Sequence, residues 1–312
     1  MYWQVKLFFS VIVLGVLGSV VYFNWDKLPM PDFNSAGKDP VPEVEKTPVV
    51  GVSKANIGAT QKSINPKIVQ KLRLAENLFK DEQDYSKARG IVENTLLDPD
   101  LEMYSREWDK TVELLSTINS KILFTTAFSP DKTDYLVKPG DNLWFIAKRH
   151  KTTINMICRG NDLDMQNPVI FPDQLLRIYT GYWNIKISKS KYRLMLYDGE
   201  RLIKVYQVGM GKENRTPVGK FTISEKQKNP IWYHNGKVIA SGDPENPLGS
   251  RWMRLTGTED SNRNYKGYGI HGTKDRSSIG QNASNGCIRM LNEEVEELYD
   301  IIKTSVPVII EK

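Results

Sequence analysis

The chain has 312 residues, of which 40% are hydrophobic and 10% aromatic, so it has enough apolar side chains for folded cores and is not disordered overall. About 150 residues per domain is a usual guide, which indicates about two domains. The net charge of +6, without a dense Lys/Arg cluster or a helix-turn-helix signature, argues against a nucleic-acid-binding protein. It favours contact with an anionic surface or polymer instead.

The first predicted element is an uncharged apolar run over residues 7–23. About 20 helical residues span a bilayer, so residues 1–25 are predicted to form an uncleaved membrane anchor or a cleaved signal peptide. We favour the anchor, because no clear small-x-small cleavage site follows the run. Both interpretations place the remaining chain outside the cytoplasm, either anchored to the cytoplasmic membrane or exported to the periplasm or cell wall.

A linker and a helical segment follow the apolar run. Residues 26–66 hold six of the 16 prolines and predict an extended linker. Residues 67–125 show helical spacing, with a hairpin that resembles one tetratricopeptide-like unit and a further helix at roughly 101–120. Ala75 and Ala88 are expected where the hairpin helices approach closely. One unit cannot bury a full core, so this segment is either a helical spacer or a protein-docking module.

Residues 134–180 predict a strand, two short helices and a strand, a small α+β unit. Asp141 is expected to cap the first helix, and His150 to lie exposed at its end. Cys158 is expected to be a buried free thiol. The segment resembles a LysM domain. The residues that carry the resemblance are Tyr135, Val137, Gly140, Asp141, Leu143, Ile146, Ala147, Ile154, Asn161, Leu163, Ile170, Pro172, Gln174, Leu175 and Ile178.

The LysM resemblance implies binding of the N-acetylglucosamine units of peptidoglycan or chitin. The family's groove lies between the loop after the first strand and the loop before the last. One departure from the family pattern is Asp173, where Gly is usual. The residues expected to bind glycan are Gly140, Asp141, Asn142, Ile170, Phe171 and Pro172.

From residue 182 onward, alternating apolar and polar residues predict a mostly-β domain over 182–312. Asn292 is expected to cap a helix over 293–303, and Val306–Ile310 to form the last strand. The whole chain is thus predicted to be multidomain, with an N-terminal transmembrane helix, an α-helical hairpin segment, a βααβ unit and this mostly-β domain.

The stretch from Gly269 to Met290 contains both a candidate nucleophile, Cys287, and a candidate base, His271. A thiolate is the reactive form of Cys, and a nearby His can accept the thiol proton. Arg289 is expected on the same strand face as Cys287, where it could hold a substrate carboxylate. By residue chemistry alone, Cys287 is either a nucleophile or a buried structural thiol. A zinc site is disfavoured, since only His234 adds another histidine to this domain.

This stretch resembles the signature of the YkuD-type L,D-transpeptidases. One departure is Asn285, where many members have a second His, and it leaves His271 as the one signature base. The matching residues are His271-Gly272, Ser284-Asn285-Gly286-Cys287-Ile288-Arg289, Thr216-Pro217, Gly219, Phe221, Ile223, Asn246-Pro247-Leu248-Gly249, Arg251, Trp252 and Ser278-Ile279-Gly280.

The resemblance implies a two-step acyl transfer that needs no cofactor and no metal. Cys287 attacks a peptidoglycan tetrapeptide stem, D-Ala leaves, and a second stem amine resolves the thioester to make a cross-link. His271 acts as base and acid. A backbone carbonyl at Gly272 or Thr273 is expected to orient its imidazole.

Further site residues follow from the same resemblance. The amides of Gly286 and Cys287 are expected oxyanion donors. Ser284 is expected to shape the loop or to bind substrate, and Arg289 to bind or anchor. The residues expected to line the cleft are Trp232, Tyr233, Tyr268 and Asn285.

Two alternatives to cross-linking remain. Water, a D-amino acid or a protein lysine could resolve the same thioester, which would give a carboxypeptidase, an exchanger or a protein-anchoring enzyme. A non-catalytic wall-binding scaffold is disfavoured, because His271, Cys287 and Arg289 are all intact. The expected partners are glycan strands, stem peptides, the membrane at residues 1–25 and a protein at the helical segment.

Overall fold

The structure, a computed structural model, describes residues 65–234 and 236–312. The predicted anchor and all but the last two residues of the predicted linker lie outside this range. Within it, no helix is both long and apolar enough to cross a bilayer.

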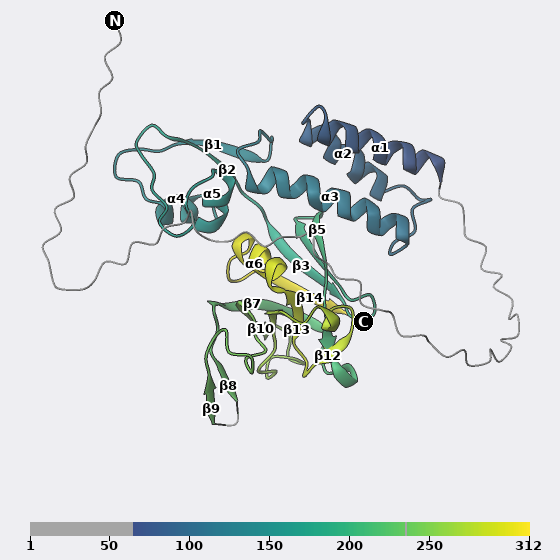
Figure 1. The fold of residues 1–312 in the computed structure, drawn as a ribbon, viewed down its shortest axis with the longest axis vertical. Coiled ribbons are helices and arrows are strands. Elements are labelled where there is room, and N and C mark those ends of the chain that lie inside the picture. Colours follow the sequence, from purple (N-terminus) through teal and green to yellow (C-terminus); the bar gives the residue numbers. More distant parts are fainter. Residues whose placement is uncertain (1–64, 235) are drawn as a thin grey trace, which may run out of the picture. The chain divides into compact units, whose positions relative to one another are not determined.

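Three helices open the described chain: α1 (Pro66–Lys80), α2 (Tyr85–Leu96) and α3 (Arg106–Phe124). Ala75 of α1 and Ala88 of α2 are both fully buried, as expected where two helices approach closely. The third helix was predicted at 101–120 but begins later, because the Ser105 hydroxyl accepts the Trp108 N–H and caps it. These helices lie beside the β5 edge of the main sheet, which α3 contacts (Figure 1).

The LysM-like segment has the predicted order of elements: β1 (Lys132–Leu136), α4 (Leu143–Arg149), α5 (Ile154–Gly160) and β2 (Leu175–Tyr179). β1 and β2 pair antiparallel over a small apolar core. Cys158 is buried in that core as a free thiol, which confirms its predicted role.

Two details of this segment differ from the prediction. Asn142, not Asp141, caps α4, because its side chain accepts the Phe145 N–H at 2.9 Å. Asp141 instead accepts the Tyr135 hydroxyl at 2.6 Å. His150 is half-buried rather than exposed, since its ring packs edge-on against Tyr135 with centroids 5.2 Å apart.

An eight-stranded mixed sheet forms the centre of the C-terminal domain, in the order β13-β11-β10-β7-β14-β3-β4-β5 (Figure 1). Its strands are β3 (Trp183–Ser188), β4 (Arg193–Asp198), β5 (Arg201–Gln207), β7 (Gly219–Lys228), β10 (Arg251–Gly257), β11 (Gly269–Thr273), β13 (Ile288–Leu291) and β14 (Pro307–Glu311). The short strands are β6 (Met210–Gly211), β8 (Trp232–His234), β9 (Lys237–Ile239) and β12 (Asn282–Ser284).

The helix α6 (Asn292–Ile301) packs against β10, β11 and β13. Its buried side includes Val295 and Leu298, which lie in the core beneath the sheet. Leu291, not Asn292, occupies the cap position, and its side chain makes no capping bond. The prediction that Asn292 caps this helix is therefore wrong.

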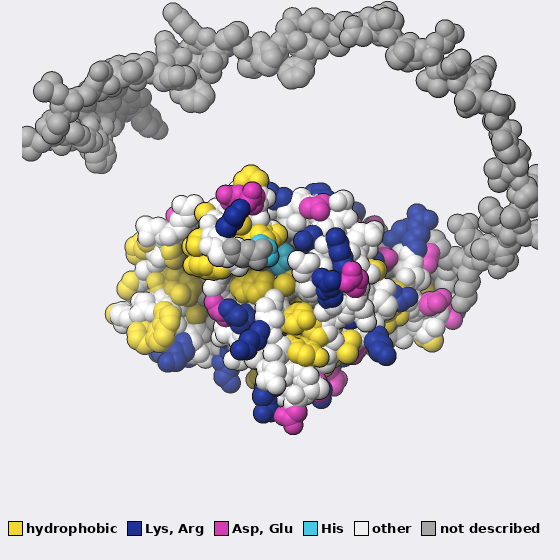
Figure 2. Space-filling view, turned by 90° about the horizontal axis from the view of Figure 1, so that it is seen from below, with side chains coloured by type: hydrophobic (Ala, Val, Ile, Leu, Met, Phe, Trp, Pro, Cys, Tyr) yellow, Lys and Arg dark blue, Asp and Glu magenta, His cyan; other side chains and the backbone are white. Residues whose placement is uncertain are grey.

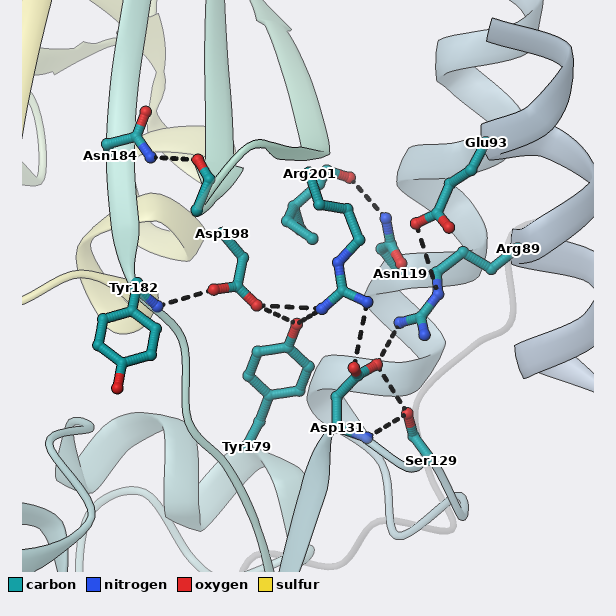
Figure 3. Close-up of polar contacts among 12 residues, drawn as sticks. Arg89, Glu93, Asn119, Ser129, Asp131, Tyr179, Tyr182, Asn184, Asp198 and Arg201 are labelled. Atoms are coloured by element: carbon teal, nitrogen blue, oxygen red, sulfur yellow. Dashed lines mark hydrogen bonds and ion pairs between the residues drawn. The ribbon is translucent and has the colours of Figure 1, made fainter. Parts of the chain in front are cut away.

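An ionic network joins the helices, the LysM-like segment and the sheet (Figure 3). Asp131 pairs with Arg89 of α2 at 2.6 Å and with Arg201 of β5 at 3.1 Å. The Arg201 guanidinium also bonds the Tyr179 hydroxyl and the Asp198 carboxylate, each at 3.1 Å. Although burial opposes ionisation, the two guanidiniums hold the pKa of Asp131 below its usual value.

A second junction links α5 to α6 through Asp300, whose side chain is buried. Arg159 pairs with its carboxylate at 3.2 Å, and Asn155 donates to the other carboxylate oxygen. Met156 and Tyr179 of the LysM-like segment also belong to the same hydrophobic core as residues of the eight-stranded sheet. The LysM-like segment is thus packed onto the C-terminal domain along α6.

Candidate active site

The parallel pairing of β11 and β13 brings the two halves of the signature together. His271 in β11 lies in register with Arg289 in β13, and Cys287 immediately precedes β13. Cys287 therefore lies one residue before the strand and not within it, but it faces the same cavity as Arg289. All five residues of β11 are buried, which fixes the backbone around the imidazole.

A cleft of about 470 Å³ holds the thiol and the imidazole. The β8–β9 hairpin, which extends from the sheet, forms one wall and contributes Trp232, Tyr233 and His234 (Figure 1). On the end of the molecule seen in Figure 2, hydrophobic side chains gather beside exposed histidine atoms, with Lys and Arg around them. The cleft is lined by Gln227, Ile231, Trp232, Tyr233, His234, Pro247, Leu248, Trp252, Arg254, Gly267, His271, Ser284, Asn285, Cys287 and Arg289.

Tyr268 does not line this cleft, in contrast to the prediction. It is half-buried against the hydrophobic core. Its ring lies 2.8 Å from the position that a Cβ on Gly286 would occupy, and Gly286 has a φ of +135°. Only glycine fits there, so the Tyr268 ring packs closely against the loop that carries the Cys287 thiol.

The His271 imidazole is neutral and is held in one orientation. Its Nδ1 lies 2.8 Å from the carbonyl oxygen of Gly272. A carbonyl only accepts, so Nδ1 carries the proton and Nε2 keeps a free lone pair. Burial lowers the pKa of His271 to about 4, since the Gly272 carbonyl offsets it only partly and Arg289 adds to it. The imidazole is therefore uncharged at neutral pH and able to accept a proton.

The Cys287 thiol is also neutral at rest. Burial raises its pKa, although a Gly269 backbone hydrogen bond and the Arg289 charge oppose the shift. Its Sγ donates to the Gly267 carbonyl oxygen at 3.4 Å rather than to His271. A thiol and an imidazole that are both uncharged differ from a preformed thiolate–imidazolium pair.

The loop before the thiol is tied by Ser284 and Thr216. The Ser284 hydroxyl accepts the Gly286 N–H at 3.0 Å and donates to the Cys287 carbonyl at 2.6 Å. Thr216, fully buried, donates to the Gly286 carbonyl at 2.9 Å. Both polar groups of Gly286 are thus engaged, so its amide is not free to stabilise an oxyanion, contrary to the prediction. Ser284 shapes the loop, which was one of its two predicted roles.

Arg289 lines two neighbouring cavities, the thiol cleft and a second of about 420 Å³. Its Nε is buried and, among the described residues, has no hydrogen-bond partner. A buried, unpaired guanidinium nitrogen is costly unless a ligand satisfies it. The geometry is suited to an anionic group such as a carboxylate. Over residues 65–234 and 236–312, no three His, Cys, Asp or Glu side chains are grouped to hold a metal ion.

The two predicted glycan-binding loops lie side by side. The Val137 carbonyl accepts the Asp173 N–H at 2.9 Å, and the Val137 N–H donates to Gln174 at 2.9 Å. Asp173 has a φ of +65°, the left-handed region that favours Gly, so the turn persists despite the substitution. Phe171 is 64% exposed at the tip of the second loop. Gly140, Asp141, Asn142, Ile170 and Pro172 complete the two loops.

Residues 183–310 match the model of the YkuD family, the L,D-transpeptidase catalytic domain, and residues 135–178 match that of the LysM domain. A Bacillus licheniformis protein named as the L,D-transpeptidase YkuD is 33% identical over 175 residues, 54% of this chain and 92% of that protein. The chain belongs to the YkuD family of L,D-transpeptidases. Another relative, the Bacillus subtilis protein YqjB, also named as an L,D-transpeptidase, is 38% identical over 125 residues, covering 40% of this chain and 68% of that one.

A solved L,D-transpeptidase from Mycobacterium smegmatis aligns with a TM-score of 0.35 and 19% identity, over 45% of this chain and 64% of that chain. In the transpeptidase described here, residues 183–310, which match the YkuD family model, run from β3 into β14 and so contain the eight-stranded sheet.

Two asparagines of this transpeptidase have positions that the sequence reasoning did not foresee. Asn246 donates to the carbonyls of Pro230, Ile239 and Ala240 at the base of the β8–β9 hairpin. Asn292 accepts the Ser250 N–H at 3.0 Å. Asn246 belongs to the Asn246-Pro247-Leu248-Gly249 motif, and that match was the sequence feature that could have indicated a structural role. Asn292 resembled an ordinary helix cap, and only the fold reveals its contact.

Proposed function

We propose that this enzyme cross-links peptidoglycan by transferring the acyl group of a tetrapeptide stem to the amine of a second stem. The observation that supports this most strongly is the pairing of a neutral, oriented His271 with the Cys287 thiol in one cleft. The Cys287 sulfur attacks the carbonyl of the stem's diamino acid, and His271 Nε2 takes the thiol proton.

The first step then releases D-Ala. The protonated imidazole gives its proton to the leaving amine, the C–N bond breaks, and a thioester to Cys287 remains. The acceptor amine attacks this thioester and loses a proton to His271, and the thiol leaves with a proton returned from the imidazole. The Cys287 amide is the proposed oxyanion donor, because that of Gly286 is bonded to Ser284.

Arg289 is proposed to bind a stem carboxylate between the two cavities that it lines. Its unpaired Nε and its position next to the thiol support this assignment. Trp232 and Asn285 are proposed as further walls of the substrate cleft. Gly272 acts only through its carbonyl, which fixes the imidazole.

The remaining segments are proposed to deliver the enzyme to its polymer. We assign residues 134–180 as a glycan-binding domain that concentrates the catalytic domain, 182–312, on the wall. Residues 67–125 are proposed as a tetratricopeptide-like spacer or docking element. Residues 1–25 are proposed as a membrane anchor that keeps the enzyme extracytoplasmic, followed by the linker 26–66.

A mass-spectrometric assay with disaccharide-tetrapeptide tests the reaction. Dimers that lack one D-Ala support transpeptidation, whereas tripeptide alone indicates hydrolysis. A D-amino acid added to the assay reveals exchange. The Cys287→Ala variant should give no product and no covalent carbapenem adduct. Absence of product and adduct from the unmodified enzyme would refute the catalytic proposal.

The glycan-binding proposal has a separate test. Phe171→Ala removes an exposed ring from the second loop and should reduce co-sedimentation with insoluble peptidoglycan. Turnover of soluble disaccharide-tetrapeptide should be unchanged. Phe128→Ala is the matched control, because Phe128 is 72% exposed but lies outside both loops. Equal binding by both variants would argue against this groove.

A further inference from the structure

Asn292, the first residue of α6, directs its side chain back toward the active site instead of capping its helix. Its Oδ1 accepts the backbone N–H of Ser250 at 3.0 Å. Ser250 ends the Asn246–Ser250 turn that leads into β10. The side chain thus joins the start of α6 to a turn that is distant in sequence.

The same oxygen packs against the backbones of Gly249 and Gly272, and the Gly272 carbonyl contacts the imidazole. A Cβ on Gly272 would lie 2.2 Å from Asn292 Oδ1, and a Cβ on Gly249 would lie 2.4 Å from it. The Gly249 Cβ position is also only 2.6 Å from the Gly272 carbonyl oxygen. There is no room for even a methyl group, so these three residues fix one another's positions.

The Gly272 carbonyl is the group that orients His271. It receives Nδ1–H at 2.8 Å on one side and lies against Gly249 on the other. We propose that Asn292 is a positioning residue for His271: by holding the Gly249–Ser250 turn against Gly272, it keeps that carbonyl aimed at Nδ1. The proposal rests on the proposed function, in which His271 Nε2 accepts the thiol proton.

The physical consequence is a choice of tautomer. With the carbonyl in place, the neutral ring carries its proton on Nδ1, and Nε2 is available as a base. If the turn moves, the Gly272 carbonyl loses the packing of Gly249 against it, its alignment with Nδ1 is no longer enforced from that side, and the ring can then populate both tautomers. Only one of them can accept the thiol proton, and a small displacement of a base costs about 10- to 100-fold in rate.

A competing explanation is that Asn292 touches substrate, because it also lines the cavity of about 420 Å³ next to the thiol cleft. Loss of a substrate contact would raise KM. Loss of positioning would lower kcat with KM nearly unchanged. The two explanations therefore predict different kinetic changes.

Asn292→Leu removes the acceptor at similar volume, whereas Asn292→Asp keeps it. Nitrogen NMR of enzyme labelled with ¹⁵N-histidine at pH 7 reports which ring nitrogen of His271 is protonated, with His271→Gln used to assign the signal. Kinetics with disaccharide-tetrapeptide are measured in parallel. Asn292→Ala replaces the Leu variant if the latter does not fold. Asn264→Ala, at an exposed site that lines neither cavity, is the matched control.

The proposal expects a mixed tautomer and a kcat reduced about 10- to 100-fold in Asn292→Leu, with KM within about twofold. Asn292→Asp should restore both the Nδ1–H tautomer and most of the rate. An unchanged tautomer in Asn292→Leu, or a change in KM alone, would overturn the proposal. Because the NMR signature needs no turnover, it tests the role of Asn292 even if the proposed reaction is wrong.

Discussion

The Ser284 hydroxyl donates to the carbonyl oxygen of Cys287 at 2.6 Å, and so closes the loop that carries the thiol. The same oxygen accepts the Gly286 N–H. Ser284→Ala leaves both backbone groups without this partner, at a cost of about 1–3 kcal/mol. We expect acylation by a carbapenem, followed by intact-protein mass spectrometry, to slow by about tenfold or more. Ser284→Thr keeps the hydroxyl and serves as control, and equal rates for the Ala and Thr variants would contradict this role.

The neutral state of the thiol predicts weak reactivity toward simple alkylating agents. Because burial raises the pKa of Cys287, little thiolate is present at neutral pH. Iodoacetamide should therefore label Cys287 slowly at pH 7 and faster only in the alkaline range. Mass spectrometry of the labelled peptide measures the rate. Fast labelling that is constant from pH 6 to 9 would reveal a preformed thiolate instead.

Protonation of the His271 imidazole should slow catalysis only at acidic pH. Burial lowers the pKa of His271 to about 4, so the imidazole stays neutral above that value and becomes protonated below it. Carbapenem acylation should therefore lose rate as pH falls through about 4 and show no acid limb near 6.5. Stopped-flow or mass-spectrometric rates across this range decide the point, and a midpoint near 6.5 would show that His271 is not buried as described.

Asn246 is expected to hold the β8–β9 hairpin over the cleft. Its amide nitrogen donates to three backbone carbonyls, those of Pro230, Ile239 and Ala240, at 3.0 to 3.2 Å. Asn246→Asp keeps the shape but removes the donors, so it should loosen the hairpin and raise KM for disaccharide-tetrapeptide severalfold. Hydrogen exchange of the hairpin amides gives an independent readout. Unchanged exchange would mean that other contacts suffice.

The buried carboxyl of Glu294 should make the free energy of unfolding depend on pH. Burial raises the pKa of its carboxyl to about 7, with Glu293 and Glu297 adding to the shift, and its Oε2 is buried without a partner in the described structure. The folded state thus binds a proton that the unfolded state releases above about 4.5. Stability from this group is present below pH 4.5 and is lost as pH rises through 7.

Glu294→Gln removes that titration. It should raise the free energy of unfolding by about 1–2 kcal/mol at pH 8 and have little effect at pH 5. Urea unfolding at the two pH values measures the difference. Glu296→Gln is the control on the same helix. A stabilisation of equal size at both pH values would exclude the titration as its cause.

Much of the fold followed from periodicity, since the strands and helices of the LysM-like segment occur in the predicted order. His271 and Cys287 were identifiable because their chemistry and motif are local in sequence. Whether the Gly286 N–H is free could not be identified from the sequence. This N–H could face a substrate or Ser284, and only the loop conformation decides between them. Asn292 misled for a similar reason: an Asn before a helix usually caps it, but here the closer partner is Ser250, 42 positions earlier.

The packing of Met156 and Tyr179 into the core of the catalytic sheet limits how the chain can be divided. A fragment that begins at residue 182 would leave an apolar hole at the sheet and the buried carboxylate of Asp300 without Arg159. Such a fragment should be aggregation-prone, and the two segments should melt together in one transition. Two segments that match separate sequence families should therefore unfold as one cooperative unit.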